Sequence, residues 1–197
     1  LIHQPNEILD PLHLNDVQPV PGAGAFWEEG DLFVSLRNVS MVFLYRPSSN
    51  KIIWHRFGPW SNQHDVDIIS DSAIAIFDNN LIKSGGRMKV DGQNDVIVYD
   101  FATDQISYPL HAALKQADVR TLRQGLMDFD ADANLWIVEE TEQGRLLGLD
   151  GEGNDIFRYY NRADGGGLFQ LGWSRLVRAD VAQSFLAVTK AADCDEK

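Results

Sequence analysis

Short apolar stretches separated by polar turns dominate the chain from about residue 14 to residue 160. The stretches are rich in Val, Ile, Leu and aromatic residues, and the breaks between them carry Gly, Asn, Asp, Pro or Ser. β-Branched and aromatic side chains favour extended backbone, whereas the turn residues end it. The pattern therefore predicts an all-β fold.

The predicted strands group into units that repeat the same order of strands and turns. In each unit, a third strand leads through a polar turn into a fourth strand with an aromatic residue, as where Ser48, Ser49 and Asn50 precede Trp54. Even spacing of this kind is typical of β-propeller blades, each a four-stranded antiparallel sheet. A β-sandwich is the alternative that the spacing leaves open. The units cover residues of about 11–60, 61–110 and 122–162, followed by a closing segment at 163–190, with a short helical insertion at about 110–120.

The chain length limits how much of a propeller is present. A blade of about 40–45 residues means that 197 residues hold about three to four blades, whereas propellers usually have about four to eight. We therefore expect residues 1–197 to form a single β-propeller domain or fragment, which upstream blades or a partner chain complete.

Two features lie outside the strand pattern. The glycine-rich stretches 85–89 and 164–167 are predicted to be exposed loops. Trp27 and Trp60, each close to glycine and proline, are expected to pack between units. On an exposed rim they would instead suit protein binding, because aromatic residues dominate contact energetics.

Composition and charge narrow the class of partner. The formal net charge of -12 disfavours nucleic acid and anionic membrane surfaces, because the mean field of the protein repels phosphate groups. No apolar run approaches the roughly 20 residues that cross a bilayer, so no membrane insertion is predicted. Cys194 is the one cysteine in the sequence, which excludes an internal disulfide and a cysteine zinc site.

Polar side chains that could bind an oxyanion recur at corresponding edges of the first two units. His13 and Asn15 begin the first unit, His64 occupies the same place in the second, and Gly125 in the third. The turn into an innermost propeller strand faces the central channel, so these side chains are expected to converge. Arg37, predicted to end the second strand of the first unit, offers a planar fork of donors for sulfuryl, phosphoryl or carboxylate oxygens. The set predicts group transfer from an anionic ester.

Each of these residues also has a structural interpretation. His13 could cap a turn or pair with Asp16, Arg37 could form an ion pair with Asp65 or Asp67, and His64 could be a hydrogen-bonded turn residue.

Metal sites fit the sequence less well. His13, His64 and Asp65 could ligate zinc, but no HExxH motif or pair of closely spaced histidines is present. Asp128 and its alternating neighbours resemble a calcium loop that lacks the required glycine and terminal glutamate. No metal and no cofactor are predicted.

Several short motifs together resemble a known family. They are His13-x-Asn15, Ser35-Leu36-Arg37, Gln63-His64, Phe77-Asp78-Asn79-Asn80 and Gly172-Trp173-Ser174-Arg175. Their order and spacing resemble the arylsulfotransferase family, the bacterial β-propeller type that does not use phosphoadenosine phosphosulfate. The resemblance covers residues of about 10–175.

The resemblance implies roles for four residues. The histidine that matches His64 becomes transiently sulfated in that family, and the residues that match His13, Asn15 and Arg37 bind the sulfuryl group. The family has a further active-site histidine in an earlier blade, for which this chain has no match, in agreement with blades upstream. Because the family is typically exported, the resemblance also implies a periplasmic or secreted protein.

The chemistry implied is transfer of a sulfuryl group from a phenolic sulfate ester to a phenol. Neutral imidazole is a nucleophile near neutral pH, and a covalent intermediate divides one difficult transfer into two easier ones. Ping-pong kinetics are expected for such an enzyme. The alternative function is a non-catalytic β-propeller that binds a ligand or a protein.

Overall fold

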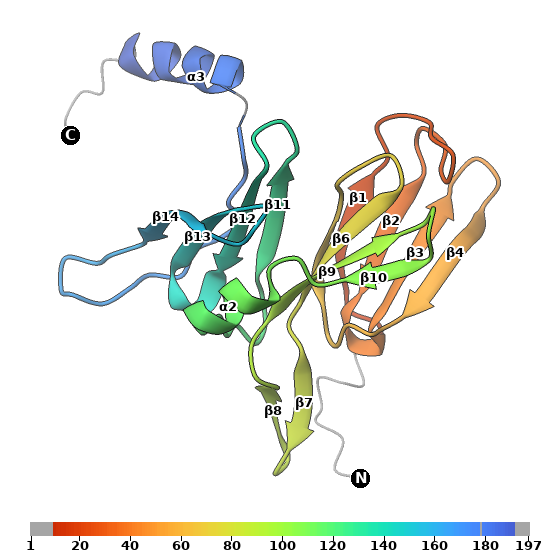
Figure 1. Ribbon diagram of the computed structural model, residues 1–197, viewed down its shortest axis with the longest axis horizontal. Coiled ribbons are helices and arrows are strands. Elements are labelled where there is room, and N and C mark those ends of the chain that lie inside the picture. The colour runs from red at the N-terminus through yellow and green to blue at the C-terminus, as the bar shows by residue number, and fades with distance from the viewer. Residues whose placement is uncertain (1–9, 178, 192–197) are drawn as a thin grey trace.

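The computed structural model describes residues 10–177 and 179–191. In this part of the chain, the strands form three four-stranded antiparallel sheets and one two-stranded hairpin, with few helices (Figure 1). The all-β prediction is confirmed. Cys194 and His3 lie outside the described residues.

The first sheet contains four consecutive strands in the order β1-β2-β3-β4. They are β1 (Leu14–Pro19), β2 (Leu32–Leu36), β3 (Met41–Arg46) and β4 (Lys51–Phe57). Arg37 does not end β2 as predicted, because the strand stops at Leu36 and the arginine begins the 3-10 turn η1 (Arg37–Val39).

The second sheet has the order β10-β9-β6-β5 and carries an inserted hairpin. Its strands are β5 (His64–Ile68), β6 (Ala73–Asp78), β9 (Asp95–Asp100) and β10 (Gln105–Ser107), and the hairpin consists of β7 (Leu81–Ser84) and β8 (Arg87–Val90). Figure 1 shows the hairpin projecting from the sheets. The prediction of a loop at 85–89 is therefore wrong. Gly85 and Gly86, with φ of 58° and 77°, supply the two left-handed residues of a tight hairpin turn.

The third sheet again consists of consecutive strands, in the order β11-β12-β13-β14. They are β11 (Leu126–Asp130), β12 (Leu135–Glu140), β13 (Arg145–Asp150) and β14 (Asp155–Tyr160), with the 3-10 turn η2 (Thr141–Gln143) after β12. The helix α2 (His111–Ala117) connects the second sheet to the third.

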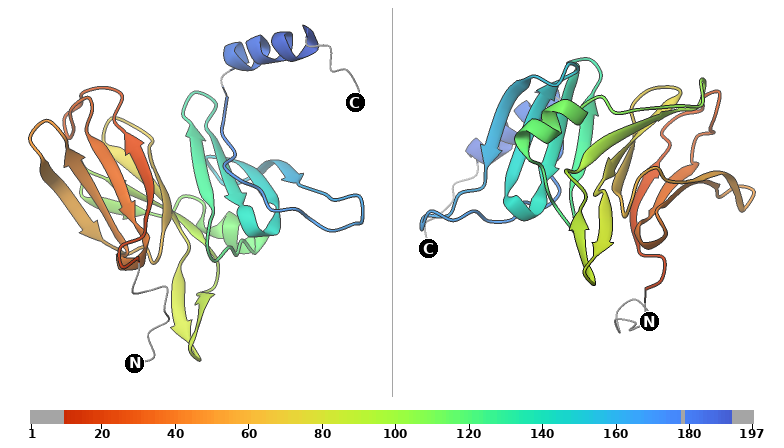
Figure 2. Two further views of the ribbon diagram at one scale, coloured as in Figure 1. Left: turned by 180° about the vertical axis from the view of Figure 1, so that it is seen from behind. Right: turned by 60° about the horizontal axis from the view of Figure 1, so that its bottom comes forward.

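A second helix, α3 (Ala179–Ala191), follows an extended segment after β14 and was not predicted. Figure 2 shows that it stands apart from the three sheets. None of the helices among the described residues has the length and apolar character that crossing a membrane requires.

The strands β1, β5 and β11 lie side by side, and aspartates connect them. Asp16 Oδ2 accepts the Val66 N–H at 2.9 Å, and Asp65 Oδ2 accepts the Met127 N–H at 2.7 Å. The series continues past β11, where Asp128 Oδ2 accepts the Leu176 N–H at 2.9 Å. Each of these three strands is thus tied to the next segment by a hydrogen bond from a backbone N–H to an aspartate side chain.

Hydrophobic side chains fill the space on both sides of the second sheet. All six residues of β6 are buried, and successive side chains of a strand point to opposite faces. Ile74 and Ile76 therefore join the core with the first sheet, whereas Ala75 and Phe77 join the core with the third sheet and α2. The second sheet is the middle layer of the molecule.

Both tryptophans of the proposed rim belong to the core between the first two sheets. Trp27 is 5% exposed and Trp60 is 2% exposed. They pack between sheets and cannot form a surface for a protein partner.

Candidate functional site

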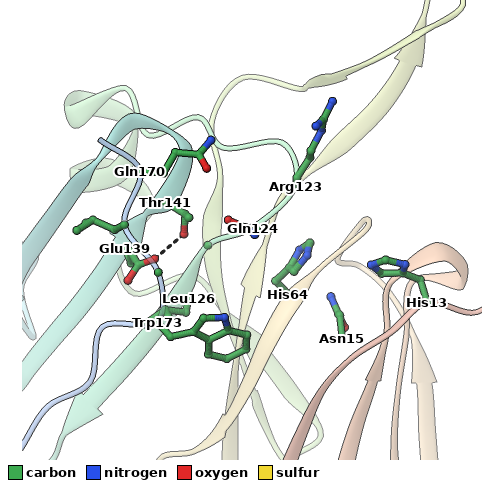
Figure 3. A pocket seen from close by; sticks show the side chains of 13 residues that line it. His13, Asn15, His64, Arg123, Gln124, Leu126, Glu139, Thr141, Gln170 and Trp173 are labelled. Atoms are coloured by element: carbon green, nitrogen blue, oxygen red, sulfur yellow. Dashed lines mark hydrogen bonds between the residues drawn. The ribbon is translucent and has the colours of Figure 1, made fainter. Parts of the chain in front are cut away.

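A cavity of about 370 Å³ lies where the three sheets meet (Figure 3). His13 and Asn15 of the first sheet and His64 of the second line one side of it. The opposite side comes from the loop before β11, the end of β12 and the segment after β14. The structure thus brings together three of the four predicted site residues.

Two β-bulges shape the strand ends that face this cavity. The pairing of β1 with β2 shifts between Leu14 and Asp16, which leaves Asn15 as the extra residue. The pairing of β5 with β6 shifts in the same way between His64 and Val66, at Asp65. Bulges change the direction of side chains and are frequent beside active sites. The irregular backbone is therefore found where the candidate chemistry lies.

His64 is held by Asn79, a residue buried at the end of β6. The Asn79 Nδ2 donates to Thr121 O at 3.1 Å and to Gln124 O at 2.8 Å. The amide oxygen of Asn79 consequently faces His64, with Oδ1 at 2.7 Å from Nδ1. Because that oxygen can only accept, Nδ1 of His64 carries the ring proton and Nε2 keeps a free lone pair.

His64 is neutral at neutral pH. Burial lowers the pKa of the imidazole from 6.5 to about 4, and the positive charges of Arg37 and His13 act in the same direction. The Asn79 hydrogen bond and the charge of Glu142 oppose the shift without reversing it. A neutral imidazole with an unprotonated Nε2 can act as a nucleophile.

His13 is fixed by Asp10 rather than by Asp16. Its backbone N–H donates to Asp10 Oδ1 at 2.9 Å, and its Nδ1 lies 2.5 Å from Asp10 Oδ2. The residue has a left-handed φ of 53°, a conformation that costs energy for a residue with a Cβ and that is common at functional sites. Asp16 is instead engaged with Val66 N–H, so the predicted His13–Asp16 pair is not formed.

One amide N–H of Asn15 is hydrogen-bonded within the described residues, whereas its second N–H and its Oδ1 are not. Its Nδ2 donates to Gln63 O at 2.7 Å, which leaves the second N–H of that nitrogen for a ligand. Its Oδ1 is one of the buried side-chain atoms that have no partner among the described residues. Buried polar atoms are nearly always hydrogen-bonded in proteins, so this oxygen is a point where a bound ligand could donate.

Arg37 lies beside this cavity and not in its lining. Its Nη1 donates to Asn38 Oδ1 at 3.1 Å and its Nη2 to Leu122 O at 3.2 Å. Burial, together with the charge of Arg123, lowers the pKa of the Arg37 guanidinium. Of the two proposed ion-pair partners, Asp65 accepts from Met127 N–H instead, and no ion pair within the described residues joins Arg37 to Asp67. Arg37 therefore acts on His64 through its charge from a neighbouring cavity.

The cavity also contains residues that the sequence motifs did not indicate. Arg123 comes from the loop before β11, Glu139 lies near the end of β12, and Thr141 begins η2. Glu139 is fully buried, and its carboxylate accepts from the Thr141 hydroxyl at 2.6 Å and from Ser174 N–H at 2.6 Å. These bonds hold the segment that carries Trp173 against the cavity.

No group of three or more His, Cys, Asp or Glu side chains in residues 10–177 and 179–191 has the arrangement of a metal site. Asp130, the last residue of β11, accepts the N–H groups of Asp132 and Ala133 in the turn that follows. It therefore stabilises a tight turn between two strands.

Comparison of the sequence with models of known families identifies the family of this chain. The family model described as Arylsulfotransferase (ASST) matches residues 2–162, which include His13, Asn15, Arg37 and His64. The chain belongs to the arylsulfotransferase family. The cavity of this arylsulfotransferase family member extends past the matched range, since Gln170 and Trp173 also line it.

Other comparisons add little to the family assignment. No curated protein matches the sequence significantly. Among solved structures, an auxiliary nutrient binding protein from Bacteroides thetaiotaomicron is similar, with 15% identity and a TM-score of 0.42. The match covers 72% of the arylsulfotransferase-family chain and 37% of that protein, so the chain spans well under half the length of this relative.

Proposed function

We propose that this chain transfers a sulfuryl group from a phenolic sulfate ester to a phenolic acceptor, with His64 as the covalent nucleophile. The observation that carries the proposal is the state of His64. Its ring lines the cavity, is neutral at neutral pH, and has Nδ1 tied to Asn79 so that Nε2 is free. Membership of the arylsulfotransferase family points to the same transfer.

In the first half-reaction, His64 Nε2 attacks the sulfur of the aryl sulfate. The N–S bond forms as the bond between the sulfur and the phenolic oxygen breaks. The phenolate leaves with the electron pair of that S–O bond. The product is a sulfohistidine whose ring keeps the proton on Nδ1. This N–H remains hydrogen-bonded to Asn79 Oδ1. In the second half-reaction, the oxygen of a deprotonated phenol attacks the sulfur, the N–S bond breaks, and neutral His64 returns. Histidine carries the group throughout, so neither half-reaction needs a cofactor.

Positive charge and hydrogen-bond donors surround the position of the sulfuryl group. We propose that His13 and the free N–H of Asn15 bind sulfuryl oxygens, and that Arg37 and Arg123 supply positive charge at the border of the cavity. One well-placed donor that meets charge developing in the transition state contributes about 3–4 kcal/mol. Trp173 offers a ring face for the aromatic part of the substrate.

We further propose that the three sheets are blades of a β-propeller over a single domain, 1–197. Consecutive four-stranded antiparallel sheets with neighbouring innermost strands β1, β5 and β11 support this architecture. Apolar residues are exposed on the outermost strands, for example Phe57 on β4 and Ile156 on β14. Such surfaces suit packing against further blades or a partner chain.

The family resemblance is the basis for two more parts of the proposal. We expect a periplasmic or secreted location. We also expect small aryl sulfates and phenols as the reacting partners, with no nucleic acid and no membrane insertion, in keeping with the net charge of -12.

Mass spectrometry after brief exposure to 4-nitrophenyl sulfate tests the proposal. We expect an added SO₃ group on His64 that is stable in base and labile in acid, and its loss in His64→Ala. His55→Ala is the matched control, because His55 is an exposed histidine on β4 that does not line the cavity. Equal turnover by His64→Ala and the parent would rule out His64 as the nucleophile. A folded protein that binds aryl sulfates without forming the adduct would instead be a binding scaffold.

A further inference from the structure

A second cavity next to the candidate active site is strongly positive in a chain that is strongly negative. This cavity, of about 350 Å³, lies between the β7–β8 hairpin, η1 and the loop before β11. Its described lining holds four cationic side chains and no carboxylate: Arg37, Lys83, Arg87 and Arg123. The formal net charge of the whole chain is -12. A cavity lined by cations alone among its charged residues therefore differs from the average composition of the chain.

None of these cations has a carboxylate partner in the part of the chain that the structure describes. Elsewhere in the described chain, arginines pair with acids, as in Arg46 with Asp31 at 2.8 Å and Arg145 with Glu140 at 2.5 Å. No ion pair within residues 10–177 and 179–191 includes any of the four cavity cations. Within this part of the chain, no direct ion-pair partner therefore cancels their charge.

The acid whose charge acts on Arg37 is already engaged. Glu142 Oε2 accepts from the Thr121 hydroxyl at 3.0 Å and from Leu122 N–H. Among the described residues, the buried Nε of Arg37 has no hydrogen-bond partner. Like charges held close together destabilise a protein unless an anion compensates them, and a guanidinium with an unused N–H offers that anion a directional bond.

The rest of the lining is apolar. Leu81, Met88 and Leu122 complete the wall together with Gly86. A site for a free, fully hydrated anion does not need such a wall. Cations combined with apolar side chains suit an organic ligand that has an acidic group on an aromatic or aliphatic body.

Arg123 connects this cavity to the candidate active site. It lines both, and Figure 3 shows it extending from the loop before β11 on the far side of His64 from Asn15. A ligand held at His64 therefore has the second cavity as its neighbour. We propose that this cavity is an anion-binding subsite for a second acidic group of the substrate, so that the preferred substrates are aromatic sulfates with an additional carboxylate or other anionic substituent.

The hairpin carries two of these cations at exposed positions, where their replacement should change the stability of the fold little. Its base is closed by Asp91 N–H donating to Asn80 O at 2.8 Å and by Asn80 Nδ2 donating to Asp91 O at 2.6 Å. Lys83 and Arg87 lie beyond this base and are exposed. Their replacement removes charge without opening either hydrophobic core.

The subsite rests on the proposed function for its biological meaning, but it can be measured without sulfuryl transfer. Sulfonates serve as probes, because a sulfonate sulfur is bonded directly to carbon and has no leaving oxygen. We would compare the affinity for benzenesulfonate with the affinities for two dianions, 4-sulfobenzoate and the longer 4'-sulfobiphenyl-4-carboxylate, by isothermal titration calorimetry. We expect at least one dianion to bind about ten-fold more tightly than the monoanion, the effect of one charge-assisted contact.

The double variant Lys83→Gln/Arg87→Gln should lose that advantage, with the affinity for benzenesulfonate changed less than about two-fold. The control Lys51→Gln/Lys89→Gln removes equal charge, from β4 and from a hairpin residue that does not line this cavity. It should keep the advantage. Equal losses in both variants would reduce the effect to net charge and overturn the proposal, as would a wild-type protein that does not prefer either dianion.

Inorganic phosphate and sulfate form the last arm of the test. If either binds as tightly as the dianions, and with the same dependence on Lys83 and Arg87, then the cavity is a site for free anions and the proposal of a substrate subsite is wrong. If no adduct forms on His64, these binding results can still be interpreted, because they do not depend on sulfuryl transfer. Conversely, loss of the dianion preference would not affect the assignment of His64.

Discussion

The amide oxygen of Asn79 lies 2.7 Å from Nδ1 of His64, and the amide nitrogen of the same side chain is held by two backbone carbonyls. This relationship determines which ring nitrogen of His64 can react. Asn79 is thus a positioning residue, since it acts on the reacting atoms only through the imidazole.

Replacing Asn79 with Asp should shift the pH dependence of the reaction. A carboxylate beside Nδ1 favours the charged imidazole, so the acidic limb of kcat/KM, expected near the His64 pKa of about 4, should move to higher pH. The measurement is the pH profile of aryl sulfate turnover. Asn50→Asp is the control, because it adds the same charge at a position whose side chain already accepts from the Tyr45 hydroxyl at 2.8 Å, away from the cavity. An unchanged profile in Asn79→Asp would mean that Asn79 does not govern the state of His64.

The protonation of His64 itself can be observed by nitrogen NMR. We expect the tautomer with the proton on Nδ1 at neutral pH and a titration near pH 4. Because the folded pKa lies below the unfolded value of 6.5, the neutral ring contributes stability that is present above pH 6.5 and is lost as the pH falls towards 4. His64→Gln should lack this acid-side loss. A wild-type imidazole that titrates near 6.5 would contradict the burial described for it.

Buried carboxyl groups should lower the free energy of unfolding as the pH rises from about 4 to 7. Burial and the nearby Asp128 and Asp16 raise the pKa of Asp67 from 3.8 to about 7. The folded state therefore holds a proton that the unfolded state has released, and the resulting stability, present below pH 3.8, is lost as the pH rises through 7.

Asp67→Asn should flatten this dependence. Chemical denaturation from pH 4 to 8 should show a slope in the wild type of at most about 1.4 kcal/mol per pH unit for each proton involved, and a smaller slope in the variant. Asp78, whose pKa burial likewise raises to about 7, should still contribute in the variant. If Asp67→Asn has the wild-type slope, Asp67 is not among the groups responsible.

Gly125 lines the cavity at a position where a side chain does not fit. It has a φ of 122°, and a Cβ at this position would overlap the Phe77 ring and lie 2.9 Å from Thr121 Cγ2. Gly125→Ala should therefore reduce the free energy of unfolding by about 1–3 kcal/mol, as overpacked sites do. Thermal denaturation measures this. Gly22→Ala, where a Cβ meets nothing within 4 Å, should have little effect, and similar losses in the two variants would mean that Phe77 yields easily.

The sequence was sufficient for the strands of the three four-stranded sheets because each of these strands repeats a local pattern. His13, Asn15 and His64 were predicted to lie together for the same reason, since they start equivalent strands, and the structure places them around one cavity. Arg37 illustrates the limit of this reasoning. Its strand ends one residue earlier than predicted, and the 3-10 turn places the guanidinium in the adjacent cavity.

Residues brought in by tertiary packing could not be predicted in this way. Arg123 belongs to a loop that has no motif of its own, and its position depends on how the third sheet packs against the second. The hairpin was missed because Gly85 and Gly86 indicate a turn, and the short polar strands beside them bury little apolar surface. Such strands give only a weak alternation signal.

The middle strand β6 has a consequence for how the protein loses its structure. Since alternate side chains of this one strand belong to different cores, neither flanking sheet can detach without exposing apolar groups of β6 to water. Modular arrays, in which each repeat contacts only its nearest neighbours, can unfold stepwise from their ends. Here, the shared strand should couple the three sheets into one cooperative unfolding transition. A destabilising substitution at Ile76 or Phe77 should therefore lower the stability of all three sheets together.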